Sequence, residues 1–381
     1  LVELRDEENN IAQFFGSIYH NNFKDFDYNV FIEIPDSIYV AGNKKFIRGL
    51  KNRKNSKNKF LSLNTNSELN NDFYGKVYGV GDINISGQEG KVAIITGGNS
   101  GLGYASALAL AEKGVTVVIA CRNTQKGNIA YNNIKLNFPK SNVEMIKLDL
   151  AKRSSIEEFA KTFQRKYKKL HILMNNAGVM ATPQQKTKDG YEYQFGINHL
   201  GHFILTGLLL PILQNTPESR IINLASLAAQ NGKIYFEDIM HNKKYSPFRM
   251  YAQTKLAVLL FSLELNKRLF AAGSHVKSIA VHPGGSQTNL GEGAKLNPIF
   301  RMMFSGFLSK FVMQPAKQGA LPQLYAATSP DAESGKYYGP DGWREIKGYP
   351  KLLKLPASAQ DEEVWKKLWE VSEDLTGMKF L

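Results

Sequence analysis

From Lys91 onward, short apolar runs alternate with segments of helical length, and this alternation restricts the fold more than any other feature of the chain. Strands joined by helical crossovers run parallel, and they need helices on both faces of the sheet to bury their apolar side chains. The sequence therefore predicts an α/β fold built on one doubly wound parallel sheet. The predicted strands are 92–96, 115–120, 143–148, 172–174, 220–224 and 277–281, and the predicted helices are 104–113, a segment ending at 135, 154–167, 197–213 and 250–270.

A glycine-rich turn, TGGNSGLG from Thr96 to Gly103, joins the first predicted strand to the first predicted helix. Its glycines allow a tight turn, close approach of the backbone to a pyrophosphate and close packing of the helix. The helix N-terminus adds free N–H groups and the positive end of the helix dipole. Because the turn lies between a strand and a helix, it predicts a Rossmann-type dinucleotide site rather than an ordinary turn. The candidate cofactor-binding residues here are Gly97, Asn99, Ser100, Gly101, Leu102 and Gly103.

The end of the second predicted strand bears on the choice between NAD(H) and NADP(H). A site selective for NAD(H) places a carboxylate near this point to bind the ribose diol. No Asp or Glu lies between Glu112 and Glu144, whereas Arg122 offers a guanidinium suited to a 2′-phosphate. We therefore expect NADP(H) to be preferred, with Arg122 and Asn123 among the cofactor-binding residues. The alternative for Arg122 is an exposed charge without a ligand.

Two further strand ends carry small or polar residues at the edge where open α/β sheets bind ligands. After the third predicted strand, a polar side chain is placed to meet the adenine amino group. The fourth predicted strand is followed by small and amide-bearing residues. The candidate cofactor-binding residues at these two ends are Asp149, Leu150, Asn176, Ala177 and Gly178.

Tyr251 and Lys255 lie four residues apart on a strongly helical segment, so their side chains share one helix face. Such a pair occurs by chance in many helices. Two other residues argue against coincidence: Ser226 ends the preceding predicted strand, and Asn198 lies on the long helix before it. All of them follow a dinucleotide turn in a consistent order. We therefore take Asn198, Ser226, Tyr251 and Lys255 as the candidate catalytic residues.

With these motifs in this order, the chain resembles the short-chain dehydrogenases/reductases, and within them the retinol-dehydrogenase-like branch that includes the WW-domain oxidoreductase. The resemblance covers roughly residues 81–372, and residues 1–80 lie outside it. One departure is Ala225, where the family often has a second serine, although Ser226 itself is present. The matching stretches are TGGNSGLG at 96–103, ACRN at 120–123, DL at 149–150, NNAGVM at 175–180, NHLGHF at 198–203, IINLAS at 221–226, YAQTK at 251–255, HPG at 282–284 and LWEVS at 368–372.

The resemblance implies a role for each candidate catalytic residue. Tyr251 would donate a proton to a carbonyl oxygen, Ser226 would hydrogen-bond that oxygen, and Asn198 would position a water. Lys255 would bind the nicotinamide ribose and lower the pKa of the phenol from ~10 toward ~7, a shift that takes about 4 kcal/mol. An ammonium at roughly 5 Å supplies about 3 kcal/mol at an effective dielectric of about 20. We therefore expect Lys255 to do most of this tuning.

The same resemblance implies that Pro283 and Gly284, with Thr288, close over the nicotinamide end of the cofactor. The alternative for Pro283 and Gly284 is an ordinary turn. His199 and His202 are three residues apart on a predicted helix, but no third ligand follows at a suitable spacing. We therefore expect no metal and assign both histidines to packing near the sheet edge.

Residues 290–315 fall where the family's substrate lid lies. Between 296 and 313, Phe, Met and Leu residues recur at helical spacing, with Arg301 and Lys310 outside the apolar stripe. One interpretation is a core helix. The other is a flexible lid for a bulky apolar carbonyl compound, which would also allow peripheral contact with a membrane surface.

A change of composition near residue 75 predicts two parts: an N-terminal extension, 1–78, and a dehydrogenase-like Rossmann domain, 79–381. We expect the extension to be irregular, with a weak strand signal only at 28–40. Its Asn- and Lys-rich segment holds eight basic residues and no acidic residue between Lys44 and Lys59, which is typical of a solvated arm. Its function is unknown. The net charge of +14 comes without a nucleic-acid-binding motif, so we expect no nucleic-acid partner.

The sequence does not determine the compartment. The longest strongly apolar stretch is too short to span a bilayer, and a single cysteine, Cys121, rules out an intrachain disulfide. The cytoplasm is the default expectation, with organelle targeting by a segment before Leu1 as the alternative. The oligomeric state also stays open, homo-oligomers included.

Two functional hypotheses follow. The first is an NADP(H)-dependent oxidoreductase that interconverts an apolar aldehyde or ketone and an alcohol by hydride transfer, with Tyr251 as general acid/base. The second is a binding protein that senses NADP(H) with little turnover and uses the extension as its partner contact. The candidate catalytic residues favour the enzyme, because a sensor needs no proton donor.

Overall fold

The computed structural model describes residues 88–286 and 314–381, together with four short strands within residues 2–63. The chain divides into two compact units, Leu1–Asp82 and Ile83–Leu381. The domain boundary that the sequence predicts, between residues 78 and 79, lies outside the described residues. So does the predicted lid segment, apart from its last two residues, Gln314 and Pro315.

The four strands of the N-terminal unit form an antiparallel sheet in the order β2-β1-β3-β4. The sequence predicts an irregular extension with a weak strand signal at 28–40, and only β3 lies within that stretch. These short strands do not alternate with segments of helical length, which is the pattern that reveals the strands of the second unit. The strands are β1 (Val2–Arg5), β2 (Ile11–Phe14), β3 (Asn29–Glu33) and β4 (Phe60–Leu63).

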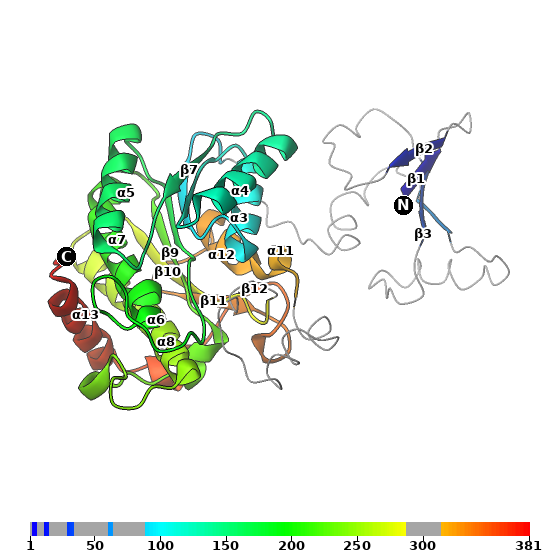
Figure 1. The fold of residues 1–381 in the computed structure, drawn as a ribbon. Helices are drawn as coiled ribbons and strands as arrows, with labels where there is room; N and C mark the ends of the chain where they lie inside the picture. The colour runs from blue at the N-terminus through cyan, green and yellow to red at the C-terminus, as the bar shows by residue number, and fades with distance from the viewer. Residues whose placement is uncertain (1, 6–10, 15–28, 34–59, 64–87, 287–313) are drawn as a thin grey trace. The chain divides into compact units, whose positions relative to one another are not determined.

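The second unit is built on an eight-stranded sheet in the order β12-β11-β10-β9-β8-β5-β6-β7 (Figure 1). Neighbouring strands run parallel except β11 and β12, which pair antiparallel. The predicted Rossmann-type sheet is therefore confirmed. The strands are β5 (Val92–Thr96), β6 (Thr116–Cys121), β7 (Val143–Lys147), β8 (Ile172–Asn175), β9 (Arg220–Leu224), β10 (Lys277–Val281), β11 (Tyr337–Pro340) and β12 (Pro350–Leu352).

Helices follow the strands and cover both faces of the sheet (Figure 1). The α-helices are α3 (Gly101–Glu112), α4 (Thr124–Asn137), α5 (Arg153–Lys166), α6 (Tyr193–Phe195), α7 (Gly201–Gln214), α8 (Pro247–Ala271), α11 (Ala316–Gly319), α12 (Leu321–Thr328) and α13 (Glu362–Thr376). A π-helical turn, Gly196–Leu200, separates α6 from α7. Short 3₁₀ helices lie at Leu227–Asn231, Phe236–Asp238, Trp343–Glu345 and Ala357–Ala359.

Successive side chains of the central strand β5 point to opposite faces of the sheet, as the strand geometry requires. Ile94 packs in one core cluster with α5 and α7, whereas Ala93 and Ile95 pack in another with α3, α4 and α12. A third cluster lies between α8 and the C-terminal part of the chain. The central strands of the sheet are thus buried on both sides, which explains why β5, β6 and β8 are almost entirely apolar.

Within the part of the chain that the structure describes, one helical stretch, Tyr193–Gln214, is long and apolar enough to cross a membrane by composition. However, 78% of its most apolar window is buried inside the fold. A helix that is apolar all round and covered by its own domain is a core helix.

The strand order reverses between β5 and β8, because β6 and β7 continue on one side and β9 and β10 on the other. Ligand sites in open α/β sheets lie at such a switch point, beyond the carboxyl ends of the strands. The segments that follow β5, β8, β9 and β10 all contain predicted site residues. The topology therefore brings these segments to one edge.

Candidate active site

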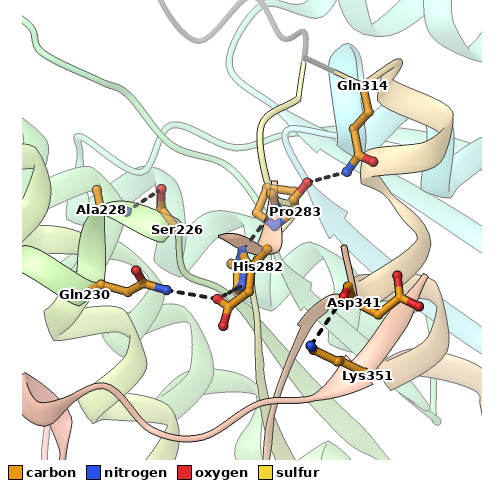
Figure 2. Close-up of polar contacts among 10 residues, drawn as sticks. Ser226, Ala228, Gln230, His282, Pro283, Gln314, Asp341 and Lys351 are labelled. Carbon is orange, nitrogen blue, oxygen red and sulfur yellow. Dashed lines mark hydrogen bonds and ion pairs between the residues drawn. The ribbon is translucent and has the colours of Figure 1, made fainter. Parts of the chain in front are cut away.

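Ser226 and Tyr251 come from different elements and meet in the structure. Ser226 follows β9 and caps the 3₁₀ helix Leu227–Asn231, where its Oγ accepts the Ala228 N–H at 3.2 Å (Figure 2). The Ser226 side chain also lies close enough to the phenol of Tyr251 on α8 to lower its pKa. Tyr251 is 8% exposed, and the low dielectric of such a buried position strengthens this electrostatic influence.

Lys255 lies one turn further along α8 and is buried beside Tyr251, as their spacing predicts. Its Nζ donates to the Leu224 carbonyl oxygen at 2.7 Å and lies 6.0 Å from the centroid of the Tyr251 ring. The last residue of β9 thus fixes the ammonium at the edge of the sheet. An ammonium has three donors, so this bond alone does not exhaust its capacity for a ligand hydroxyl.

The pKa values of this pair shift in opposite directions. Burial raises the pKa of the Tyr251 phenol, and the Ser226 side chain opposes that rise without cancelling it. Burial also lowers the pKa of Lys255 to about 8. Burial thus has the larger effect on the phenol of the protein by itself, and the lowering of its pKa beside a bound nicotinamide stays a prediction. A phenol that keeps its proton at neutral pH is suited to donate one.

Asn198 lies in the π-helical turn Gly196–Leu200, where the sequence predicts a continuous α-helix. Its Oδ1 accepts the Val179 N–H at 2.8 Å, and its Nδ2 donates to the Val179 carbonyl at 2.9 Å and to Thr254 Oγ1 at 3.0 Å. Asn198 therefore braces the loop after β8 against α8. Single π-turns of this kind frequently occur at functional sites. Its predicted role in positioning a water stays a prediction.

Gly178 connects the predicted cofactor-binding residues to the predicted catalytic ones. A methyl group added at Gly178 would lie 3.2 Å from Asn198 Oδ1 and 3.6 Å from Lys255 Nζ. The loop after β8 and the α8 residues therefore border one common site.

Thr96, the last residue of β5, ties the glycine turn to the end of β8. Its Oγ1 accepts the backbone N–H groups of Asn176 and Ala177, both at 2.9 Å, and its carbonyl accepts Asn176 Nδ2 at 2.7 Å. A methyl group at Gly103 would lie 2.5 Å from Asn176 Nδ2 and 2.5 Å from the Gly97 carbonyl oxygen. The turn needs glycine at this position, because the amide and the backbone occupy the space of a side chain.

The glycine turn fits the pyrophosphate-binding role that the sequence predicts for it. Ser100 is the N-cap of α3, but its side chain makes no capping hydrogen bond, so the first-turn N–H groups suit an anion. Asn176 Oδ1 is buried and has no hydrogen-bond partner among the described residues, which fits a polar ligand at this edge. Gly101 adopts a φ of 55°, Leu102 is buried below the turn, and Asn99 is half-buried in it.

Arg122 follows β6, and its Nη1 donates to the phenol oxygen of Tyr193 at 2.7 Å. Tyr193 packs against the core cluster formed with α5 and α7, so it holds the exposed guanidinium in place. The hydrogen bond with Tyr193 and the negative charge of Asp149 raise the pKa of Arg122. The neighbouring Asn123 caps α4, because its Oδ1 accepts the Lys126 N–H at 2.9 Å.

Asp149 and Leu150 follow β7 and have different environments. Asp149 is half-buried, and its Oδ1 accepts the Ala151 N–H at 3.0 Å. Leu150 packs into the core, and its carbonyl oxygen would be 2.8 Å from a methyl group at Gly201. Asp149 thus places a carboxylate at the sheet edge, whereas Leu150 contributes mainly to packing.

Pro283 and Gly284 follow β10 in a turn held by several hydrogen bonds. The Pro283 carbonyl accepts Gln314 Nε2 at 2.7 Å (Figure 2) and the Ser286 hydroxyl at 2.8 Å. Gly284 has a φ of 64°, a conformation that favours glycine. Thr288, which the sequence groups with these residues, lies outside the described part of the chain.

His199 and His202 are buried and hydrogen-bonded. His199 Nε2 lies 2.8 Å from Ser372 Oγ. His202 Nδ1 donates to the Asn198 carbonyl at 3.0 Å, so its Nε2 is the acceptor for the Thr96 hydroxyl at 2.9 Å. Burial lowers the pKa of His199 to about 3 and that of His202 to about 4, so both rings are neutral. The described residues include no group of three His, Cys, Asp or Glu side chains that could hold a metal ion.

Several residues that shape this site are not among the candidate site residues predicted from the sequence. The sequence offered two signals: the threonine that opens the glycine turn and the second histidine of NHLGHF. The other residues make contacts between segments far apart in the chain, which a single sequence does not reveal. The residues concerned are Thr96, Tyr193, His202, Gln230, Thr254 and Glu345.

The structure combines a buried tyrosine and lysine on one helix with a glycine turn at the switch point of a parallel sheet. This is the arrangement of a nucleotide-binding oxidoreductase. Comparison with protein families agrees with this class, because the model of the short chain dehydrogenases matches residues 91–297. The chain belongs to the short chain dehydrogenase family, in its retinol-dehydrogenase-like branch.

Individual relatives show how far the similarity extends. Retinol dehydrogenase 12 of Mus musculus is 41% identical over 293 residues, which cover 76% of this chain and 88% of that protein. Retinol dehydrogenase 13 of Mus musculus is 42% identical over 296 residues, with coverages of 76% and 84%. A solved structure of an uncharacterised protein from Mycobacterium paratuberculosis has a TM-score of 0.65 and 37% identity, and covers 78% of this chain and 97% of that one. The resemblance stated from the motifs is confirmed.

Proposed function

We propose that the protein is an NADP(H)-dependent oxidoreductase that interconverts an apolar aldehyde or ketone and an alcohol. The observation that carries this proposal is the buried pair Tyr251 and Lys255 on α8, in which Lys255 Nζ lies 6.0 Å from the centroid of the Tyr251 ring and is held by the Leu224 carbonyl. The Ser226 side chain lies close enough to the phenol to lower its pKa. A pure nucleotide sensor has no need of a buried proton donor supported in this way. The family membership supports the same reaction class.

Each residue of the site would have its own role in carbonyl reduction. When bound, NADPH would supply the hydride. Tyr251, protonated because burial raises its pKa, would donate its proton to the carbonyl oxygen. Ser226 would hydrogen-bond the same oxygen as negative charge develops there. Lys255, charged below its pKa of about 8, would stabilise the phenolate that remains.

The preference for NADP(H) is proposed from Arg122. Tyr193 fixes its guanidinium through a hydrogen bond of 2.7 Å, and no carboxylate lies between Glu112 and Glu144 to bind a ribose diol. A guanidinium held in one orientation binds phosphate well. Asn123 and the glycine turn would complete the adenine half of the site.

The substrate class rests on two observations. The relatives named above are retinol dehydrogenases, and a retinol is a long apolar alcohol. The sequence between 296 and 313 is rich in Phe and Met, which suits a lid over an apolar substrate. We therefore propose a bulky apolar carbonyl compound, of which a retinoid aldehyde is one candidate.

The test is an assay of purified protein with NADPH and, in parallel, with NADH. The panel comprises small polar aldehydes, long-chain aldehydes, ketones and retinoids. We expect NADPH oxidation to be faster than NADH oxidation, and apolar carbonyl compounds to be turned over faster than small polar ones. Binding of NADPH without oxidation by any member of the panel would contradict the proposal.

A further inference from the structure

A chain of hydrogen bonds links the helix of the catalytic serine to the turn predicted to cover the nicotinamide (Figure 2). Gln230, on the 3₁₀ helix that begins after Ser226, donates from Nε2 to Glu345 Oε2 at 2.9 Å. His282 Nε2 lies 3.1 Å from the same carboxylate oxygen. The Gly284 N–H lies 3.1 Å from His282 Nδ1. One carboxylate therefore connects the segments after β9 and β10.

The direction of these bonds follows from the chemistry of the ring. A backbone N–H can only donate, so His282 Nδ1 accepts from Gly284 and the ring carries its proton on Nε2. That proton is donated to Glu345. The His282 side chain is fully buried, and a methyl group at Gly339 would lie 2.2 Å from its Nε2, so the ring cannot turn freely. The carboxylate of Glu345 therefore holds the His282 ring in place, and the ring in turn holds the Gly284 backbone.

The backbone that carries Glu345 is strained. Arg344 and Glu345 have φ values of 49° and 58°, a left-handed conformation that is unfavourable for residues with a Cβ. Such strain persists only where the surroundings enforce it, and it clusters at functional sites. The same turn contacts Gly284 and its neighbour: Gly285 N–H donates to the Ile346 carbonyl at 2.8 Å, and a methyl group at Gly284 would lie 2.3 Å from that oxygen.

We propose that Glu345 is a positioning residue, whose carboxylate fixes the Pro283–Gly284 turn relative to the Ser226 helix and thereby supports binding of the nicotinamide end of the dinucleotide. This inference rests on the proposed function. It concerns one end of the site only, because the residues predicted to bind the adenine end lie after β5, β6 and β7 and make none of these contacts with Glu345.

The experiment compares two ligands on the full chain. NADPH spans the whole site, whereas adenosine 2′,5′-bisphosphate carries only the adenine end. We expect Glu345→Ala to raise the Kd for NADPH about tenfold and to leave the Kd for the bisphosphate within about twofold of the wild type. Glu345→Gln should retain NADPH binding within about threefold, because one amide oxygen can still accept from both Gln230 and His282.

A matched control removes a carboxylate elsewhere: Glu370→Ala, at an exposed position of α13, should change neither Kd. Should Glu345→Ala fail to fold, Glu345→Asp keeps the charge but shortens the side chain, and is expected to weaken NADPH binding alone. The inference would be overturned if Glu345→Ala and Glu345→Asp both bound NADPH as the wild type does. It would also be overturned if these substitutions weakened the binding of NADPH and of the bisphosphate equally. Failure of the wild type to bind NADPH would instead overturn the proposed function.

Discussion

Lys255 sets the pH range of the proposed reaction, because only its charged form stabilises the phenolate left by Tyr251. Burial lowers its pKa to about 8 from the ordinary value of 10.5. The rate of carbonyl reduction at saturating NADPH should therefore be steady below about pH 8 and fall as the pH rises through that value. The measurement is kcat against pH, with Lys267→Met, an exposed lysine on the same helix, as the control that keeps the profile.

Unfolding of the protein does not explain the expected fall of the rate above about pH 8. Between pH 8 and 10.5 the unfolded chain holds a proton on Lys255 that the folded protein has released, so this group adds stability as the pH rises. The decline in kcat should therefore occur although the deprotonation of Lys255 does not lower the melting temperature. A rate that stays constant to pH 9.5 would show that the charge of Lys255 is not needed.

Arg122 and Tyr193 should control the choice of nucleotide. Arg122→Ala removes the guanidinium, and we expect the KM for NADPH to rise about 10-fold or more while the KM for NADH stays nearly constant. Tyr193→Phe removes only the oxygen that holds the guanidinium at 2.7 Å, so the rise should be smaller, about threefold. Steady-state kinetics with both nucleotides measure this. Equal changes for NADPH and NADH would contradict it, and Arg165→Ala on α5 is the control.

At the scale of the elements, the glycine turn after β5 leaves little room for a side chain. At Gly103 an added methyl group would meet Asn176 Nδ2 and the Gly97 carbonyl, both at 2.5 Å. Overpacking of this kind costs about 1–3 kcal/mol, so Gly103→Ala should lower the melting temperature by about 2–8 °C and weaken NADPH binding. Gly98→Ala, whose methyl group would have its nearest neighbour at 3.1 Å, should be milder. Equal melting temperatures for the two variants would argue against this packing.

The sequence predicted elements well where the period of apolar residues is regular. Strands β9 and β10 have the predicted bounds, because each is a short, largely apolar segment between segments of helical length. The π-helical turn at Gly196–Leu200 was missed, because its apolar pattern continues that of α7. The Gly201 N–H donates to the Gly196 carbonyl, five residues earlier, and the apolar pattern does not reveal this change from the α-helical spacing.

The sequence predicted some features of the candidate site but not others. Ser226, Tyr251 and Lys255 carry short motifs, so their meeting could be foreseen from their order in the chain. The pKa direction of Tyr251 could not, because it depends on how completely α8 is buried. Glu345 could not either, since its contact with His282 joins residues 63 positions apart.

At the scale of the whole molecule, the chain forms two compact units, and the described site residues all lie in the second, Ile83–Leu381. We propose that this unit is the oxidoreductase domain and that the N-terminal extension is not required for nucleotide binding. A chain that begins at residue 83 should bind NADPH within about twofold of the full chain and melt at the same temperature. Loss of binding or of cooperative melting would show that the first unit supports the site.

The proton carried by the Tyr251 phenol is the central claim, and one substitution tests it most directly. Tyr251→Phe keeps an aromatic ring in the packed position and removes only the phenol hydroxyl, whose pKa the Ser226 side chain affects. The measurement is single-turnover oxidation of bound NADPH by an apolar aldehyde, together with the Kd for NADPH. We predict a rate at least about 100-fold below wild type with a Kd within about twofold. A variant that oxidises NADPH at the wild-type rate would contradict the account.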